Sequence, residues 1–420
     1  MQFSPKLLSL AAEAEAALAG HFARIDGVSF ANTSRVLDSF RTHRVSDAHF
    51  AGTSGYGYDD RGRETLDEIY ADLFGAEAAF VRHSIVNGTQ ALTIGLFGLL
   101  RPGDIMLSAA GKPYDTLEEV IGIAGTPGNG SLADYGISYG QIELKDGKLD
   151  LEAIGKALAE NKSIKVVFVQ RSKGYLNRPT LSVAEIGELC TFVHEHSNAF
   201  VMVDNCYGEF TETMEPTAVG ADLIAGSLIK NPGGGMAESG GYLAGTAKAV
   251  ELASYRLTTV GVGGEVGATL GQNKSMFKGF FYAPHTVKEA LKTAMFAAYI
   301  FEKMGFDAEP RYDTPRHDII QALNFKDPEL LKAFCRGIQY GSPVDAYVTP
   351  EPWDMPGYTD QVIMAAGTFT SGASIELSAD GPMRPPYTAF FQGGLTFESG
   401  KLGILSAARE VLKSITAMQN

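Results

Sequence analysis

The sequence of 420 residues has few cysteines, one tryptophan and a deficit of positive charge. Its three cysteines, Cys190, Cys206 and Cys335, are odd in number and far apart, so they predict no disulfide framework and favour a reducing, cytoplasmic setting. Lysine and arginine total 35 against 49 aspartates and glutamates, a net charge of −14. Because nucleic-acid backbones attract clustered cations, this balance argues against a general nucleic-acid-binding protein.

Long apolar runs are also absent. The longest largely apolar run, residues 91–100, is far shorter than the roughly 20 residues that a membrane-spanning helix needs. The N-terminal residues 1–20 resemble a signal peptide in part, but Glu13 and Glu15 interrupt their apolar stretch. We therefore expect an amphipathic surface or interface helix there, in a soluble protein without a membrane partner.

Apolar residues make up 45% of the chain, enough for a large core. From about residue 78 to 245, short apolar strand-like runs alternate with helix-like segments. This alternation, with strands that are apolar throughout, predicts an α/β fold in which helices cover both faces of a mostly parallel sheet. The predicted strands are residues 80–83, 105–108, 164–169, 200–203, 223–225 and 242–244, and the predicted helices between them are 90–100, 116–121, 151–160 and 183–196.

The pattern changes after residue 245, where we expect two long helices at 246–256 and 284–304 and then short mixed elements. We predict three parts: an N-terminal helical arm of residues 1–55, a large domain of 56–285 and a smaller α+β C-terminal domain of 286–420.

Two predicted strands are followed by residues that could bind a ligand or take part in catalysis. Their position matters because ligands of open α/β sheets bind at the carboxyl ends of the strands. Asp204 follows the strand 200–203, although a turn aspartate would look the same. Lys230 follows the strand 223–225 and precedes three glycines, although an exposed loop lysine is the commoner outcome. If the lysine is desolvated, its amine pKa falls and it becomes a nucleophile that can form a Schiff base.

Two further strand exits precede helices. Gly88 and Thr89 lie where backbone N–H groups at a helix start meet an anion such as phosphate. Tyr114 lies where its ring could stack on a flat cofactor, and Ser227 lies three residues before Lys230. An anion cradle, an aromatic ring, a carboxylate and a lysine in this order are what pyridoxal phosphate (PLP) requires. We therefore expect PLP as the cofactor and no metal.

The chain also resembles a known family over nearly its whole length. It is similar to the fold-type I PLP enzymes of cysteine and methionine metabolism, and most of all to the methionine γ-lyase-like family often named for aluminium resistance. The resemblance implies a PLP-dependent transferase-like fold, with a large and a small domain. The motifs that carry it are SGYGYDDRGRETLDEIYADLFGAE (54–77), RPGDIMLSAAGKPYDTLEEVIG (101–122), VDNCYGEF (203–210), GADLIAGSLIKNPGGG (220–235), GGEVGATLG (263–271), SPVDAYVTPEPWDMPGY (342–358) and IELSADGP (375–382).

The resemblance also implies a role for each matching residue. Lys230 is similar to the Schiff-base lysine, Asp204 to the partner of the pyridine nitrogen and Tyr114 to the ring-stacking tyrosine. Gly88, Thr89 and Ser227 resemble the phosphate-binding residues.

In the wider family a tyrosine and an arginine reach the phosphate of the neighbouring subunit. Their counterparts here are among Tyr56, Tyr58, Arg61 and Arg63, at altered spacing. A homodimer or homotetramer with shared sites is therefore expected.

One departure concerns the arginine that binds the substrate carboxylate in the wider family. The corresponding stretch, residues 390–395, contains no arginine. Arg384 is the nearest candidate, and a solvent-exposed loop arginine is the alternative. The thiol of Cys206, two residues after Asp204, is expected to be structural.

The resemblance implies a carbon–sulfur lyase that converts a methionine- or cystathionine-type amino acid to thiol, ammonia and an α-keto acid. A γ-replacement enzyme, an aminotransferase and an inactive PLP-binding protein remain alternatives. A nicotinamide-dependent dehydrogenase is disfavoured because the glycines of residues 261–267 follow no strand-like run. A metal hydrolase is disfavoured because His194 and His196, two apart on a helix, face different ways.

Overall fold

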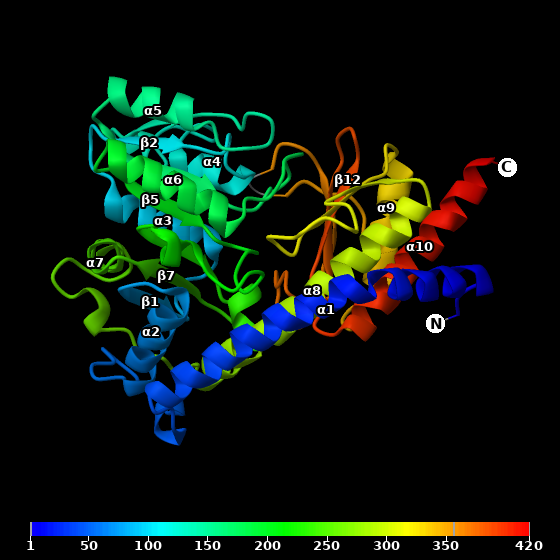
Figure 1. The fold of residues 1–420 in the computed structure, drawn as a ribbon, viewed down its shortest axis with the longest axis horizontal. Coiled ribbons are helices and arrows are strands. Elements are labelled where there is room, and N and C mark those ends of the chain that lie inside the picture. Colours follow the sequence, from blue (N-terminus) through cyan, green and yellow to red (C-terminus); the bar gives the residue numbers. More distant parts are fainter. Residues whose placement is uncertain (1, 356–357, 420) are drawn as a thin grey trace.

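The computed structural model describes residues 2–355 and 358–419. Two sheets lie side by side, the larger one surrounded by helices and the smaller one beside α9 and α10 (Figure 1). The larger sheet has the strand order β1-β7-β6-β5-β4-β2-β3, in which β7 runs antiparallel to both of its neighbours and the other pairs are parallel. Its strands are β1 (Ala78–Arg82), β2 (Ile105–Ser108), β3 (Ser138–Gln141), β4 (Ile164–Gln170), β5 (Phe200–Asp204), β6 (Leu223–Ser227) and β7 (Gly241–Gly245).

Both faces of this sheet are buried, which confirms the predicted architecture. Along β4, Val167 and Val169 join one apolar core, whereas Val166 and Phe168 join another on the opposite face. Because successive strand residues point to opposite faces, an apolar strand without alternation is what two covered faces require. The helices of the first face are α2 (Arg61–Phe74), α5 (Leu151–Glu160) and α6 (Val183–His196), and those of the second are α3 (Gly88–Leu99), α4 (Asp115–Ile121) and α7 (Ala247–Leu257).

Local sequence signals set several helix starts. The side chain of Asp150 accepts a hydrogen bond from the Ala153 N–H at 3.0 Å, and Ser182 forms a capping box with Glu185. Aspartate and serine are typical N-cap residues, so both helix starts follow from the local sequence. The strand β3 was missed by sequence reasoning because its residues Ser-Tyr-Gly-Gln form a polar edge without an apolar run.

The smaller sheet is antiparallel throughout and has the order β10-β11-β12-β9-β8. The C-terminal core forms where its strands pack against helices. Its elements are β8 (Asp307–Glu309), β9 (Gln321–Asn324), α9 (Pro328–Gly341), β10 (Val362–Ala365), β11 (Ser378–Pro382), β12 (Thr388–Gln392) and α10 (Phe397–Gln419).

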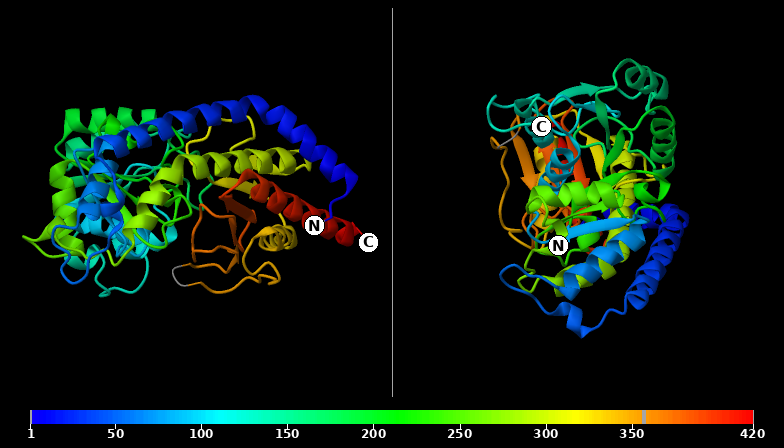
Figure 2. Two further views of the ribbon diagram at one scale, coloured as in Figure 1. Left: turned by 90° about the horizontal axis from the view of Figure 1, so that it is seen from below. Right: turned by 90° about the vertical axis from the view of Figure 1, so that its left-hand side faces the viewer.

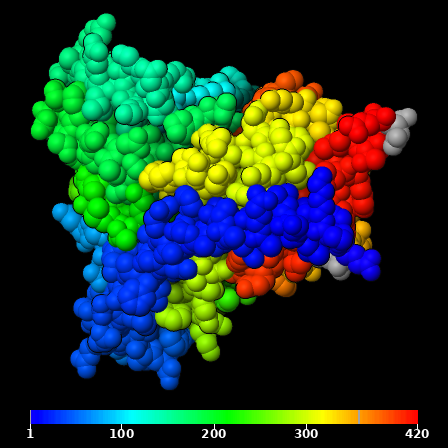
Figure 3. Space-filling model, turned by 45° about the vertical axis from the view of Figure 1, so that its right-hand side comes forward, coloured from blue at the N-terminus to red at the C-terminus, as the bar shows by residue number. Residues whose placement is uncertain are grey.

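Two long helices connect the two halves. The helix α1 (Pro5–Thr42) lies along α8 (Asn273–Lys303), and both span the two lobes (Figures 1 and 2). In the space-filling view α1 crosses the face of the molecule from one lobe to the other (Figure 3). Helix α1 forms most of the segment predicted as an N-terminal arm, and it places Leu18 in the C-terminal core and Val36 in the core of the large domain.

The predicted boundary near residue 285 falls inside α8. This helix begins at Asn273, so the predicted start at residue 284 was wrong. Pro284 lies within the helix, and its carbonyl oxygen accepts a hydrogen bond from Ser29 Oγ at 3.0 Å. Residues of α8 up to Leu291 join the large-domain core and those from Met295 onward join the C-terminal core.

The three cysteine thiols are free and buried. Among residues 2–355 and 358–419, no helix combines the length and the apolar content needed to cross a membrane.

The contact between α9 and α10 depends on a glycine. A Cβ atom on Gly337 would lie 2.3 Å from the Cα of Ala407, closer than real Cβ contacts. We expect Gly337→Ala to destabilise the fold by about 1–3 kcal/mol through overpacking. Gly27→Ala is the matched control, because nothing lies within 4 Å of the added carbon on the exposed side of α1. Thermal unfolding checks the pair, and equal unfolding temperatures for the two variants would contradict this account.

Candidate functional site

A cavity of 560 Å³ lies at the carboxyl ends of β4, β5 and β6, where the two sheets meet. Residues of the large domain form most of its wall, and Asp380, Phe390 and Gln392 of the smaller sheet complete it. The cavity brings together six residues that the sequence predicted from separate strand exits. They are Gly88, Thr89, Tyr114, Asp204, Ser227 and Lys230.

Lys230 lies just beyond β6, and its Nζ atom is 4.0 Å from the centre of the Tyr207 ring. Burial alone would lower the pKa of Lys230, but the acidic groups of Cys206, Tyr207 and Asp204 around it raise that pKa well above its ordinary value. The free amine is therefore held as an ammonium ion, which differs from the lowered pKa expected from the sequence. The amine must lose this proton before it can act as a nucleophile.

Asp204 is the last residue of β5 and is buried. Its Oδ1 atom accepts a hydrogen bond from the Cys206 N–H at 3.1 Å. Burial raises the pKa of Asp204, and the charge of Lys230 opposes this rise. A cationic ring nitrogen placed beside such a carboxylate would stabilise its ionised form.

Tyr114 directly precedes α4, and two threonines hold its position. Its hydroxyl lies 2.8 Å from Thr89 Oγ1, which is also 3.2 Å from Thr116 Oγ1. The backbone N–H of Tyr114 donates to Gln170 Oε1 at 2.8 Å. Burial raises the pKa of Tyr114 well above its ordinary value, so the phenol is neutral at neutral pH.

A candidate anion site lies at the start of α3. The side chain of Asn87 accepts from the Gln90 N–H at 2.8 Å, whereas the N–H groups of Gly88 and Thr89 have no acceptor within the described parts of the chain. Ser227 Oγ is buried without a hydrogen-bond partner there. A Cβ atom on Gly88 would lie 3.0 Å from Cys206 Sγ and 3.6 Å from Ser227 Cβ, so a side chain would fill the space between them. Free donors around such a space suit a phosphate group.

The four residues proposed to serve a neighbouring subunit do not line this cavity. Tyr56 and Tyr58 are exposed, and their rings stack with centres 5.8 Å apart. Arg61 is exposed at the start of α2. Arg63 is buried and anchored in its own chain, where NH1 donates to the carbonyl oxygens of Gly57 and Gly267 at 2.5 and 2.9 Å.

Arg384 lies beside the cavity rather than in its wall. Its guanidinium pairs with Asp360 at 2.9 Å. It lines a smaller pocket of 270 Å³ that shares Tyr114 and Asp115 with the main cavity and also contains Lys112. Arg384 is thus near the cavity mouth.

Several wall residues were missed by sequence reasoning. Gln170 ends β4, so the strand-exit rule that found Asp204 applied to it as well. Asp380, an acid within a strand, lay inside a family motif but was assigned no role. The aromatic residues Tyr175 and Tyr207 come from loops. Tyr207 lay inside the motif VDNCYGEF (203–210) but was assigned no role, and Tyr175 carried no sequence signal.

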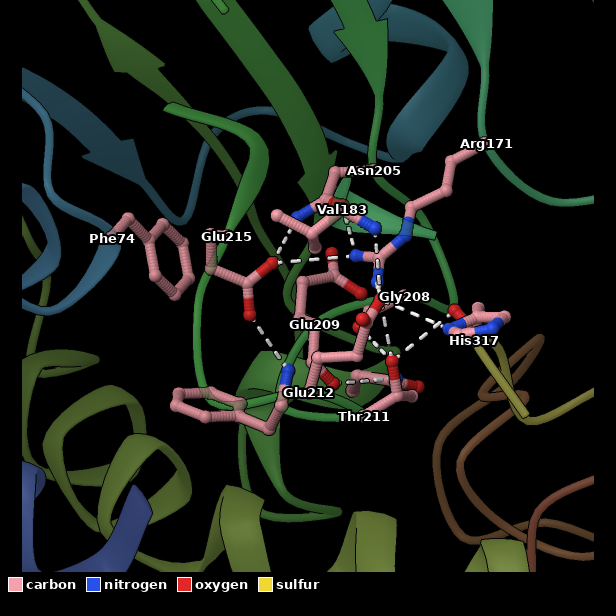
Figure 4. A network of polar contacts seen from close by, with 12 residues as sticks. Phe74, Arg171, Val183, Asn205, Gly208, Glu209, Thr211, Glu212, Glu215 and His317 are labelled. Carbon is pink, nitrogen blue, oxygen red and sulfur yellow. Dashed lines mark hydrogen bonds and ion pairs between the residues drawn. The ribbon is translucent and has the colours of Figure 1, made fainter. Parts of the chain in front are cut away.

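A polar network supports the loop that follows Asp204 (Figure 4). Arg171 is fully buried, and its guanidinium donates to Asn205 Oδ1 at 2.8 Å and to Glu212 Oε1 at 2.7 Å. Glu215 accepts from the side chain of Asn205 at 2.9 Å. His317 Nδ1 lies 3.1 Å from Glu212 Oε1, which links the network to the segment before β9.

Glu209 lies in the same region, but its carboxyl group is only partly hydrogen-bonded. Tyr242 donates to its Oε1 atom at 2.8 Å, but Oε2 has no partner within the described residues. Burial raises the pKa of Glu209 to about 8, with a further contribution from Glu215. This carboxyl group is therefore neutral at neutral pH.

Comparisons with known proteins place the chain among PLP enzymes. A family model described as methionine γ-lyase matches residues 7–412. The "Uncharacterized protein YnbB" of Bacillus subtilis is 54% identical over 97% of both chains. A crystal structure of a "carbon-sulfur lyase involved in aluminum resistance" from Clostridium novyi has 51% identity and a TM-score of 0.93, over 97% of this chain and 96% of that one. The L-methionine γ-lyase of Pseudomonas putida is 26% identical over 46% of this chain and 44% of its own length.

Glu209→Gln tests whether the buried carboxyl is neutral. The folded chain keeps this proton up to about pH 8, whereas the unfolded chain loses it near pH 4.5, so the stability of the wild type falls as pH rises between these values. The amide does not ionise. We therefore expect the unfolding temperature of Glu209→Gln, relative to wild type, to rise by several degrees between pH 6 and pH 9.

Glu212→Gln is the control for this experiment. Burial raises the pKa of Glu212, but the hydrogen bond with His317 and the charge of Arg171 outweigh that effect and lower it. This variant loses an ionised partner of Arg171, so it should be less stable than wild type at both pH values. A Glu209→Gln difference that does not change with pH would show that Glu209 is ionised in the fold.

Proposed function

The chain belongs to the methionine γ-lyase family, and we propose that it is a PLP-dependent carbon–sulfur lyase acting on a sulfur amino acid. The observation that carries this proposal is the convergence of Lys230, Asp204 and the free donors around Gly88 on one cavity. The Clostridium novyi structure, similar over almost its whole length, is described as a carbon–sulfur lyase, which supports the same reaction class.

The residues of the cavity fit PLP, which family membership implies. Lys230 would bond the aldehyde carbon, and Asp204 would accept a hydrogen bond from the ring nitrogen. The ring would stack on Tyr114, and the unpartnered hydroxyl of Ser227 with the N–H groups of Gly88 and Thr89 would bind the phosphate. When bound, the cofactor supplies an electron sink for the charge that develops at the substrate α-carbon.

The chain itself supplies the proton transfers. Lys230, once its amine is neutral, removes the α-proton. Asp204, as a carboxylate, would hold the proton on the ring nitrogen. The carbon–sulfur bond then breaks, the sulfur leaves with the bonding electron pair, and a proton from Lys230 or Tyr114 completes the thiol. Water releases ammonia and the α-keto acid. For γ-elimination a proton must also leave the β-carbon, and the same two side chains lie on the cavity wall.

Arg384 is our candidate for the substrate carboxylate. It lies near the mouth of the cavity, where burial raises the pKa of Asp115 and the charge of Arg384 opposes that rise. To bind a carboxylate it would have to exchange its present partner, Asp360.

We also propose that the active form is a homodimer or a homotetramer. Tyr56, Tyr58 and Leu270 are exposed, and the Leu270 N–H donates to the Thr53 carbonyl oxygen at 3.1 Å, so these apolar side chains lie on two adjoining segments. Val86 on the cavity wall is exposed as well. A second copy that covered them would bring its own Tyr56, Tyr58 or Arg61 toward this cavity.

Borohydride reduction followed by peptide mass spectrometry tests the cofactor assignment. We expect the pyridoxyl group on Lys230 and on no other lysine. Lys230→Ala should lower turnover at least about 100-fold, whereas the exposed Lys248→Ala should not change it. Turnover is measured as thiol, ammonia and α-keto acid from methionine, cystathionine, cysteine and O-acylated homoserines. Dependence on an added keto acid without ammonia release would indicate an aminotransferase, and cofactor on another residue would refute the assignment.

Mixing two inactive variants tests the shared site. In a heterodimer of Lys230→Ala and Arg61→Ala chains, one of the two sites would receive Lys230 from one chain and Arg61 from the other. Random mixing should therefore restore about a quarter of wild-type activity. The same mixture with Tyr56→Phe or Tyr58→Phe in place of Arg61→Ala identifies which residue crosses. If no pair of variants recovers activity, or if size measurements show an active monomer, the proposal that subunits share their active sites is wrong.

A further inference from the structure

The wall of the cavity is acidic beyond the residues assigned to the cofactor. Among the described residues that line it, Lys230 is the sole basic side chain, and it is assigned to PLP together with Asp204. The charged side chains that remain are Asp115 and Asp380. A substrate side chain that enters this space therefore meets two carboxylates and no cation.

The two carboxylates differ in their surroundings. Asp115 lies toward the mouth, where burial raises its pKa and the charges of Arg384 and Lys112 oppose this rise without cancelling it. Asp380 lies on β11 and forms no ion pair within residues 2–355 and 358–419. Its Oδ2 atom accepts a long hydrogen bond of 3.4 Å from Gln392 Nε2. The cation that acts on Asp380 is Lys230, which is assigned to the cofactor, whereas Arg384 and Lys112 act on Asp115.

Burial raises the pKa of Asp380 to about 6, while hydrogen bonds from Tyr175 and Gln392 and the charge of Lys230 act to lower it. Asp380 is therefore mostly ionised at neutral pH. An ionised carboxylate that has lost part of its hydration gains most from a cation that donates hydrogen bonds to it. The pairing residue on β12, Phe390, lines the same wall and offers an apolar surface for methylene groups.

We propose that Asp380 determines specificity by binding an ammonium group at the far end of the substrate side chain. The substrate would be an amino acid in which sulfur carries a short aminoalkyl group, with its methylenes on Phe390 and its ammonium on Asp380. A second carboxylate at that end would be repelled by the same wall. This inference rests on the proposed lyase function, because it assumes that the α-amino group is held at the cofactor.

A matched pair of ligands tests the inference. S-aminoethyl-L-cysteine and S-propyl-L-cysteine have the same shape and differ by an ammonium in place of a methyl group. We expect the PLP-loaded wild type to bind the first at least about 10-fold more tightly, as a charge-assisted hydrogen bond requires. Asp380→Asn should remove this preference and leave the affinity for S-propyl-L-cysteine nearly unchanged. Equilibrium binding by calorimetry and kcat/KM for thiol release are measured on the same samples.

Asp115→Asn is the control, because it removes the other wall carboxylate and should retain the preference for the ammonium. A test that needs no variant uses S-carboxyethyl-L-cysteine, which wild type should bind more weakly than the propyl compound. The proposal is overturned if wild type binds all three ligands alike or if Asp380→Asn keeps the preference. If the binding preference holds but no thiol is released from any ligand, the lyase function fails while the role of Asp380 stands.

Discussion

A buried guanidinium is the constraint on which the site depends. Arg171 has no access to solvent, so its charge must be matched inside the protein. Asn205, Glu212 and Glu215 match it, and all three belong to the segment that leaves β5 directly after Asp204. The loop is therefore fixed by the need to satisfy one cation. Asp204 therefore has a fixed position at the edge of the sheet, where its carboxylate accepts a hydrogen bond from the Cys206 N–H.

The parallel pairing of β4, β5 and β6 explains which residues of the site could be predicted from the sequence. Asp204 and Lys230 follow apolar strands, and the rule that ligands bind at the carboxyl ends of such strands is enough to place both residues at one edge of the sheet. Gln170 obeys the same rule and was overlooked. Tyr207 and Tyr175 come from loops whose course depends on long-range packing, which a local pattern does not encode.

The smaller sheet was the less predictable half for a physical reason. Its strands are short, antiparallel and interrupted by loops, and Asp380 and Gln392 reach the cavity because β11 and β12 pair in one particular register. A shift of one residue would turn both side chains away. Helix α8 shows a similar limit: it was predicted to begin at residue 284, yet packing against two cores keeps the helix continuous through Pro284.

That continuity has a mechanical consequence. The helix α8 places Phe280 in the core of the large domain and Phe301 in that of the small one, and α1 lies beside it across the same span. Large hinge motions usually take place in loops or at the ends of elements. Here, two adjacent helical rods bridge the lobes, so a wide opening of the cleft would require bending both of them and pulling side chains out of two cores. Substrates must therefore enter through rearrangement of side chains and short loops at the rim, with the lobes held at a nearly constant separation.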